Sequence, residues 1–266
     1  MAWGSAWYGR SYDLGRITFR DLVVAYMTCP AIQIYAVLAV LSAGTAFYLV
    51  NSLGEIILPI LATLIVYPVA WYFIHRFILH GRWLYRMPWT ASLWKRIHFD
   101  HHQDPHKLEV LFGAPSNTLP TIALVTLPVG YLLNGLGGAA TAFAAGLLVT
   151  SFYEFCHCIQ HLNYQPRLAF MKRIKQLHLA HHFHNENGNY GIVSFLPDRL
   201  FGTLYNRAKD WPRSSHVFNL GYDLEEARRF PWVMDLTGAP PRARPPGVSE
   251  NNSHSGEDGD ALRMTP

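Results

Sequence analysis

The sequence has 266 residues, a formal net charge of +4, and 50% hydrophobic against only 15% charged residues. A soluble domain carries about 25% charged residues, so this composition excludes an ordinary soluble enzyme and predicts a membrane protein. The excess cations fit a membrane topology, and we predict no nucleic-acid partner.

Residues 1–30 are mixed, aromatic and charged, unlike the basic start and apolar core of a signal peptide. We predict a cytoplasmic or interfacial arm. Two apolar runs follow, Ala31 to Val50 and Ile56 to Ile74, with a short polar break between them. Each run is near the ~20 residues with which a helix crosses a bilayer.

A second apolar stretch divides in the same way, into roughly 110–134 and 139–156, with a glycine-rich turn around Gly135. All 22 Lys and Arg lie outside these stretches, in residues 1–30, 75–107 and 157 onward. Because cytoplasmic loops collect Lys and Arg, these blocks and both termini are predicted to be cytoplasmic.

The predicted fold is therefore an all-α integral membrane protein, with four transmembrane helices in two hairpins and a cytoplasmic, histidine-rich helical cap. These elements occupy residues 31–237. The last segment, 238–266, is rich in Pro, Gly, Ser, Asn and acidic residues and is predicted to be disordered.

The sequence has 14 histidines, and ten of them fall into four groups near the predicted cytoplasmic ends of the spans. The groups are His75 and His80; His98, His101 and His102; His157 and His161; and His178, His181 and His182. In a helix, positions i, i+3 and i+4 share one face, so each H-x-x-H-H group can aim three imidazoles in one direction. His75 and His80 are about 140° apart and converge only if the helix bends or frays.

Imidazole nitrogen suits borderline metals such as iron, copper and zinc. Ten clustered histidines without a thiolate are too many for one ion, and two ions sharing a nitrogen cage is the economical interpretation. We treat His106, His184, His216 and His254 as ordinary core or surface residues. Cys29, Cys156 and Cys158 form no C-x-x-C pair and carry no functional argument.

Four acidic residues near the histidines are candidates to accept an imidazole N–H. Glu154, one helical turn before His157, is favoured for this role or as an occasional ligand. Asp100 and Asp104 are more typical of exposed residues. Asp198 either caps a turn or bonds a histidine N–H, and the structural role is favoured. Asn185, Asn187 and Asn189 are expected to shape a link of strong turn character.

The four boxes, "HRFILH", "HFDHH", "HCIQH" and "HLAHH", resemble the fatty acid hydroxylase superfamily, which includes sterol desaturases, sterol methyl oxidases, fatty acid 2-hydroxylases and carotenoid hydroxylases. The resemblance covers roughly Trp71 to Tyr205, and "HHFHNENGNYGIVSFLPDRLFGTLY" is similar to the closing segment of that superfamily. The fatty acid 2-hydroxylase branch is the most similar. The segment "QDPHKLEVLFGAP" keeps only the general shape of that branch, and neither 1–30 nor 205–266 is expected to form the cytochrome b5 domain often fused to it.

The resemblance implies that the ten histidines hold two iron ions, which zinc can replace in purified protein, and that O2 is the co-substrate. It implies hydroxylation of a fatty-acyl chain or sphingolipid, with carotenoid or sterol oxidation as the alternative. The substrate would enter laterally between the spans. A separate electron donor, a ferredoxin or cytochrome b5 with its reductase, is required, and Arg167, Lys172, Arg173 and Lys175 either attract it or only anchor the topology.

Other classes of protein fit the sequence less well. A metal carrier needs polar ligands at the bilayer midplane, whereas these histidines gather at one membrane edge. A haem-binding electron carrier needs facing histidines within its spans, and a zinc protease of the H-E-x-x-H type is excluded because that motif is absent.

Overall fold

The computed structural model describes residues 12–244, which are helical with no strand among them. The helices are α1 (Phe19–Met27), α2 (Pro30–Leu49), α3 (Leu53–Phe73), α4 (Pro88–Trp94), α5 (Asp100–Gln103), α6 (Pro115–His161), α7 (Ala169–Phe183), α8 (Leu196–Leu200), α9 (Leu224–Arg229) and α10 (Trp232–Thr237). Two π-helical turns, η2 (Ile74–Leu79) and η3 (Lys95–Phe99), and two 3₁₀ turns, η4 (Leu108–Val110) and η5 (Ala208–Asp210), complete the described chain. Residues 245–266 of the tail predicted to be disordered, 238–266, and residues 1–11 of the predicted arm lie outside the described chain.

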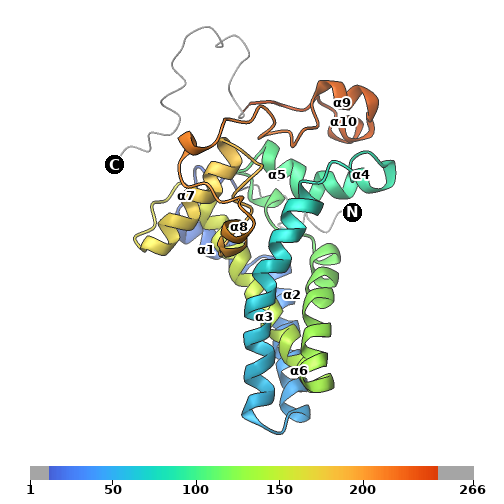
Figure 1. Ribbon diagram of the computed structural model, residues 1–266, viewed down its shortest axis with the longest axis vertical. Coiled ribbons are helices and arrows are strands. Elements are labelled where there is room, and N and C mark those ends of the chain that lie inside the picture. The colour runs from blue at the N-terminus through green and yellow to red at the C-terminus, as the bar shows by residue number, and fades with distance from the viewer. Residues whose placement is uncertain (1–11, 245–266) are drawn as a thin grey trace.

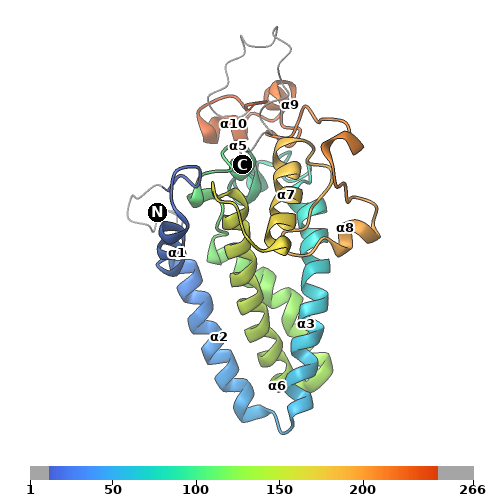
Figure 2. The ribbon, with the colours of Figure 1, turned by 90° about the vertical axis from the view of Figure 1, so that its left-hand side faces the viewer.

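The molecule consists of a long stem and a broader cap (Figures 1 and 2). The stem is built from α2, α3 and α6, with α6 packed against both other helices. In the described residues these three helices, with α3 extended through η2, are long and apolar enough to cross a membrane. Large apolar side chains such as Leu132 (84% exposed) and Val40 (72% exposed) point away from the protein. Such a surface is stable against hydrocarbon and unstable against water.

Four spans were predicted, and α6 covers the residues of the third and fourth with 47 residues. Asn134 and Gly135 interrupt it with non-helical dihedral angles, at the predicted glycine-rich turn. Gly135 has φ of +52°, a conformation that glycine adopts without a Cβ penalty. The two arms of α6 then touch: a Cβ on Gly130 would lie 2.2 Å from the carbonyl oxygen of Gly138.

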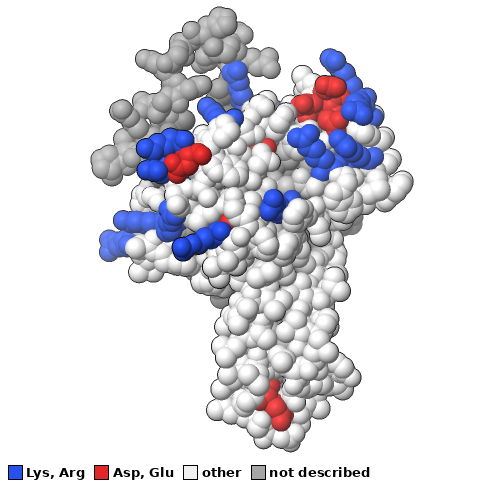
Figure 3. All heavy atoms as spheres, in the orientation of Figure 1, with Lys and Arg blue, Asp and Glu red and all other residues white. Residues whose placement is uncertain are grey.

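The two turns at the end of the stem are joined by Glu55. Its Oε2 accepts hydrogen bonds from the backbone N–H of Asn51 and from Nδ2 of Asn134, both at 3.0 Å. This bond fixes the α2–α3 turn beside the break in α6. The stem carries no Lys or Arg, whereas both signs of charge lie on the cap (Figure 3).

Contacts of α1 hold the cap to the stem, and an aromatic cluster holds the opposite part of the cap together. α1 lies within the predicted arm and packs on α6, where the hydroxyl of Tyr26 donates to the carbonyl of Ser151 at 2.6 Å. On the other side a buried aromatic cluster joins α4 to the segment around α9, with Tyr85, Trp94 and Tyr222 fully enclosed. Aromatic rings bury the largest areas per residue, so this cluster fixes the helices that lead into α5.

Candidate metal centre

The first histidine pair depends on the π-helical turn η2, which continues α3. The backbone N–H of His80 donates to the carbonyl of His75 at 3.0 Å, an i to i+5 bond. In such a turn a residue five positions on lies beneath the first, and π turns are frequent at functional sites. The apparent mismatch of the H-x4-H spacing is thereby removed. A second π turn, η3, carries His98 immediately before α5.

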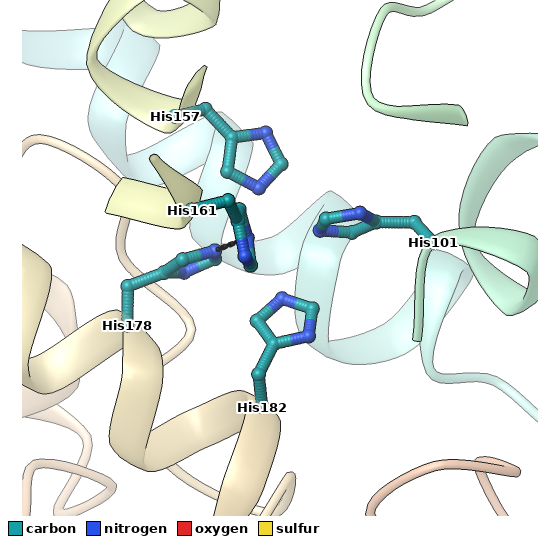
Figure 4. A group of neighbouring side chains, drawn as sticks. All are labelled: His101, His157, His161, His178 and His182. Carbon is teal, nitrogen blue, oxygen red and sulfur yellow. Dashed lines mark hydrogen bonds between the residues drawn. The ribbon is translucent and has the colours of Figure 1, made fainter. Parts of the chain in front are cut away.

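Five imidazoles form one group in which one ligand nitrogen from each lies within 4.8 Å of all the others. They come from the end of α6, from α7 and from α5, and they point toward one another (Figure 4): His157, His161, His178, His182 and His101. The Nε2 atoms of His161 and His178 are 2.9 Å apart.

Four imidazoles, His75, His80, His98 and His181, form a second group of the same compactness. The Nε2 atom of His75 lies 3.1 Å from that of His98 and 3.2 Å from that of His80, and the third side of the triangle is 2.9 Å. Nitrogens bound to one ion at about 2.1 Å lie roughly 3.0–3.4 Å apart, so the spacing fits a shared ion.

The tenth histidine, His102, joins the two groups because its ligand nitrogen lies within 4.8 Å of His181 and His182. Each H-x-x-H-H box is therefore divided. His98 faces the four-histidine group and His101 the five-histidine group, and on α7 His181 and His182 divide in the same manner. The expectation that each box aims three imidazoles in one direction was wrong. α5 and α7 lie between the two histidine groups, so the imidazoles of each box point to both groups.

The ring nitrogens fit a metal on chemical grounds. Eight of the ten histidines are buried, and seven of the ten have at least one buried ring nitrogen without a hydrogen-bond partner in the described structure. An unpaired buried polar atom costs about 1–3 kcal/mol. So many unpaired nitrogens in one place are explained by ions that accept their lone pairs.

Backbone carbonyls hold three of these rings in the required tautomer. Nδ1 of His75 donates to the carbonyl of Tyr190 at 2.5 Å, Nδ1 of His102 to Val217 at 2.8 Å, and Nδ1 of His181 to Gly188 at 2.7 Å. A proton on Nδ1 leaves the lone pair on Nε2, which faces the group.

Burial also keeps the imidazoles neutral. It lowers the pKa of His181 to about 4, opposed by the hydrogen bond to Gly188. The pKa values of His101, His102, His178 and His182 are lowered well below the ordinary value, first by burial and then by the neighbouring rings. At neutral pH these side chains therefore present lone pairs rather than charges.

The asparagine-rich link after α7 positions the accepting carbonyls. Asn189 has φ of +56° and is fully buried; its Nδ2 donates to the carbonyls of Leu177 and Tyr205, and its Oδ1 accepts from the N–H of Tyr205. Gly188 leaves no space for a side chain, since a Cβ would lie 2.5 Å from the carbonyl of Thr203. The link thus brings two carbonyls, those of Gly188 and Tyr190, against the imidazoles.

Asp198 holds this link in place through hydrogen bonds to its backbone. Its carboxylate accepts from the backbone N–H groups of Tyr190 and Gly191 at 2.8 and 2.9 Å and from the hydroxyl of Thr203 at 2.8 Å. It bonds no imidazole itself. Because the carbonyl of Tyr190 holds His75, Asp198 acts on the cage through the backbone, consistent with the favoured structural role.

We expect Asp198→Asn to lower stability, because an amide NH2 would face one backbone N–H and a carboxylate acceptor would be lost. The expected cost is about 2–4 kcal/mol, or a fall of roughly 5–10 °C in the melting temperature of the detergent-purified protein. Asp210→Asn, which removes an exposed carboxylate that pairs with Arg207, should change it by about 1 °C or less. Equal melting temperatures for the two variants would contradict the proposed anchoring.

The other predicted acceptors do not contact an imidazole in the described structure. The Glu154 carboxylate interacts with the backbone of Gly113. Asp100 pairs with Lys95 at 2.8 Å, and Asp104 pairs with Lys107 at 2.9 Å and with Arg242 at 3.0 Å. The acceptors observed for three of the rings are backbone carbonyls, which no residue type in the sequence indicates. The glycines and asparagines of "NENGNYG" were the signal that could have located two of them.

Lys175 requires a correction. It was grouped with exposed cations for donor attraction, but it is buried, and its Nζ donates to the carbonyls of Ile159 and Leu162 at the end of α6. Burial lowers its pKa to about 8. Its function in the fold is to fasten α7 to the helix end that carries His157 and His161. Of the isolated histidines, His106 donates to the carbonyl of His161 and His184 to that of Trp211; His254 lies outside the described residues.

An apolar groove lies directly beneath the cage. It has a volume of about 420 Å³ and is lined by α3, α6 and the segment before α8: Leu64, Pro68, Leu148, Val149, Phe152, Tyr153, Val193 and Ser194. Along α3 the same stripe continues through Trp71 to His75, and along α6 Tyr153 lies one turn before His157. The rings of Trp71 and Tyr153 meet at 6.3 Å between the groove and the histidines.

Residues 60–203, more than half of the chain, match the family model described as fatty acid hydroxylase. The chain belongs to the fatty acid hydroxylase family. The resemblance seen in the four histidine boxes is thereby confirmed. The family match includes most of α3, both π turns, α6, α7 and the link that ends at Thr203, so it contains all ten clustered histidines.

The chain matches only part of the length of its curated relatives. A dihydroceramide fatty acyl 2-hydroxylase of Arabidopsis thaliana, FAH1, is 30% identical over 161 residues, which are 58% of this chain and 63% of the relative. The ceramide very long chain fatty acid hydroxylase SCS7 of Saccharomyces cerevisiae is 29% identical over 136 residues, 50% of this chain and 34% of the relative. The fold is similar to the solved structure of full-length scs7p with only its hydroxylase domain visible, with a TM-score of 0.60, 27% identity and coverage of 69% and 68%.

Proposed function

We propose that this protein is a membrane-bound lipid hydroxylase that holds two iron ions in its ten-histidine cage and uses O2 to oxidise a C–H bond of a fatty-acyl chain or sphingolipid. The observation that carries the proposal is the pair of adjacent, buried imidazole groups with unpaired nitrogens. The fatty acyl and ceramide hydroxylases among its relatives support the choice of substrate.

In this proposal the five-histidine group would hold one ion and the four-histidine group the other, with His102 between them. The iron ions would supply the activation of O2 for C–H oxidation. The chain supplies the geometry: carbonyls fix the tautomers, and burial keeps the imidazoles neutral. The groove beneath the cage would hold the acyl chain in an apolar, water-poor environment, with its reacting carbon near Trp71 and Tyr153.

We further propose that the stem crosses the membrane four times, with the two arms of α6 as separate spans and the cap on the cytoplasmic side. The bond between Glu55 and Asn134 supports this topology, because it places both turns at the end of the stem opposite the cap. The gathering of Lys and Arg on the cap supports a cytoplasmic orientation. Residues 1–30 would then form an interfacial arm and 31–237 the membrane hydroxylase domain, followed by the tail at 238–266.

Metal analysis of the detergent-purified protein, prepared anaerobically with iron supplied, tests the proposed function. We expect about two iron ions per chain, and a large loss in His181→Ala, whose imidazole lies at the junction of the two groups. His216→Ala, which removes an imidazole outside the groups, should retain both. Absence of bound metal, or a single ion that survives His181→Ala, would point instead to a structural or carrier role.

A further inference from the structure

The proposed reaction creates a demand for electrons. Insertion of one oxygen atom into C–H forms C–OH, and the second oxygen atom of O2 leaves as water, which requires two electrons and two protons beyond those of the lipid. Within the described residues no haem or flavin site is evident among the elements of the cap. Electrons must therefore enter from a partner, and the site of their entry rests on the proposed function.

One face of the cap combines positive charge with a partly exposed aromatic residue. The start of α7 and the segment 206–213 are joined by a hydrogen bond from Arg173 to Asn206. We name residues 167–173 and 206–213 the Trp211 face. It carries six exposed cations, Arg167, Lys172, Arg173, Arg207, Lys209 and Arg213, and one exposed acid, Asp210. Figure 3 shows this charge over α7 and the segment after α8, whereas the α9 region mixes both signs.

A continuous chain of contacts leads from Trp211 to the cage. Its indole stacks on the buried ring of Tyr205, with centroids 5.1 Å apart and planes at 21°. The Tyr205 ring packs on the backbone of Gly188, where a Cβ would lie 2.9 Å from the ring. The carbonyl of Gly188 accepts from Nδ1 of His181 at 2.7 Å. Only two residues, Tyr205 and Gly188, separate the partly exposed indole from a candidate metal ligand.

The segment around Trp211 is also held in place by hydrogen bonds from the residues that follow α7. Nε2 of His184 donates to the carbonyl of Trp211 at 2.8 Å, and Nδ2 of Asn185 donates to that of Pro212 at 2.7 Å. Both donors lie directly after α7, the helix that carries His182. A contact surface built in this way is pre-organised, so that little ordering entropy is lost when a partner binds.

We propose that an acidic one-electron carrier protein docks on the Trp211 face and that its electrons reach the metal centre through Trp211, Tyr205 and the Gly188 to His181 hydrogen bond. Cations around a central aromatic residue match the charge of such a partner and steer its approach. Two successive one-electron transfers complete the reaction. An anionic lipid surface would satisfy the cations but would make no use of the aromatic stack.

Binding is tested with full-length protein in nanodiscs and two soluble probes, an acidic [2Fe–2S] ferredoxin and the haem domain of cytochrome b5. Lys172→Glu/Lys209→Glu should weaken binding of the recognised probe about tenfold at low salt and flatten its salt dependence. Arg82→Glu/Arg228→Glu changes the same charge in the α9 region and should leave the dissociation constant within about twofold. Equal effects of the two pairs would overturn the docking site. Unchanged probe binding with reduced adsorption of anionic vesicles would assign the face to lipid.

The route is tested by stopped-flow oxidation of the pre-reduced probe. At saturating probe, so that any change in affinity is removed, Trp211→Leu should slow oxidation of the bound probe about tenfold, and Trp211→Phe should recover much of the rate. Equal rates in all three proteins would overturn the route. A single turnover separates the two hypotheses: the protein is reduced anaerobically with dithionite, the dithionite is removed, and O2 is then admitted. Absence of product in the wild type counts against the hydroxylase itself, and product in Trp211→Leu leaves only the route in question.

Discussion

His101→Ala is expected to abolish lipid hydroxylation, with a loss of at least ~10³-fold, while the protein still inserts into the membrane. His101 contributes to the five-histidine group from α5, outside the three membrane-length helices. Its ring has two buried nitrogens without a partner, so its removal takes a ligand from one ion and no hydrogen bond from the fold. His98→Ala is expected to have an equal effect through the four-histidine group.

The measurement is hydroxylated product per membrane-inserted protein, together with iron content. His216→Ala serves as the control and should retain activity within about twofold, since its imidazole belongs to neither group. Near-normal product from both His101→Ala and His98→Ala would defeat the assignment of the cage. Loss of activity in only one variant would show that a single histidine group carries the chemistry.

Filling the groove is the second large effect that we expect. Val149 lines the groove on α6 and lies one turn before Tyr153. Val149→Trp would place an indole in the volume of about 420 Å³ that we assign to the acyl chain. We expect product from long-chain substrates to fall at least ~10-fold, because a pocket rejects groups that it has no room to hold.

Iron content should stay unchanged in Val149→Trp, which separates loss of the substrate site from loss of the metal. Leu132→Trp is the matched control, since Leu132 is on the same helix, 84% exposed and directed away from the protein. If Val149→Trp and Leu132→Trp turn over long-chain substrate equally well, the groove does not hold the acyl chain. A shorter substrate that regains activity in Val149→Trp would further localise the chain within it.

The sequence alone predicted the apolar stem, the break near Gly135 and the ten clustered histidines. These features are local: hydropathy within about 20 residues defines a span, and a histidine is recognised wherever it stands. Even the turn chemistry of "NENGNYG" indicated a shaped link. The family could be recognised for the same reason, since its boxes are short and their order along the chain is retained.

Only the tertiary structure decided how the histidines are shared. His98 and His101 belong to one box yet face different groups, because α3, α6 and α7 meet α5 from different sides. The π turn that brings His75 and His80 together is a local backbone conformation that α-helical periodicity does not predict.

The supporting contacts are equally non-local. The carbonyls that fix the tautomers, such as Val217 for His102, lie as many as 115 residues from their histidines, and backbone acceptors leave no signature in a motif. The contacts of Lys175 are also non-local. It is buried and joins α7 to α6 because its partners are carbonyls at a helix end rather than charged groups. Sequence thus indicated which residues are candidates for the chemistry, and the packing of distant helices decided what each one contacts, because burial and hydrogen bonding depend on neighbours that local patterns do not specify.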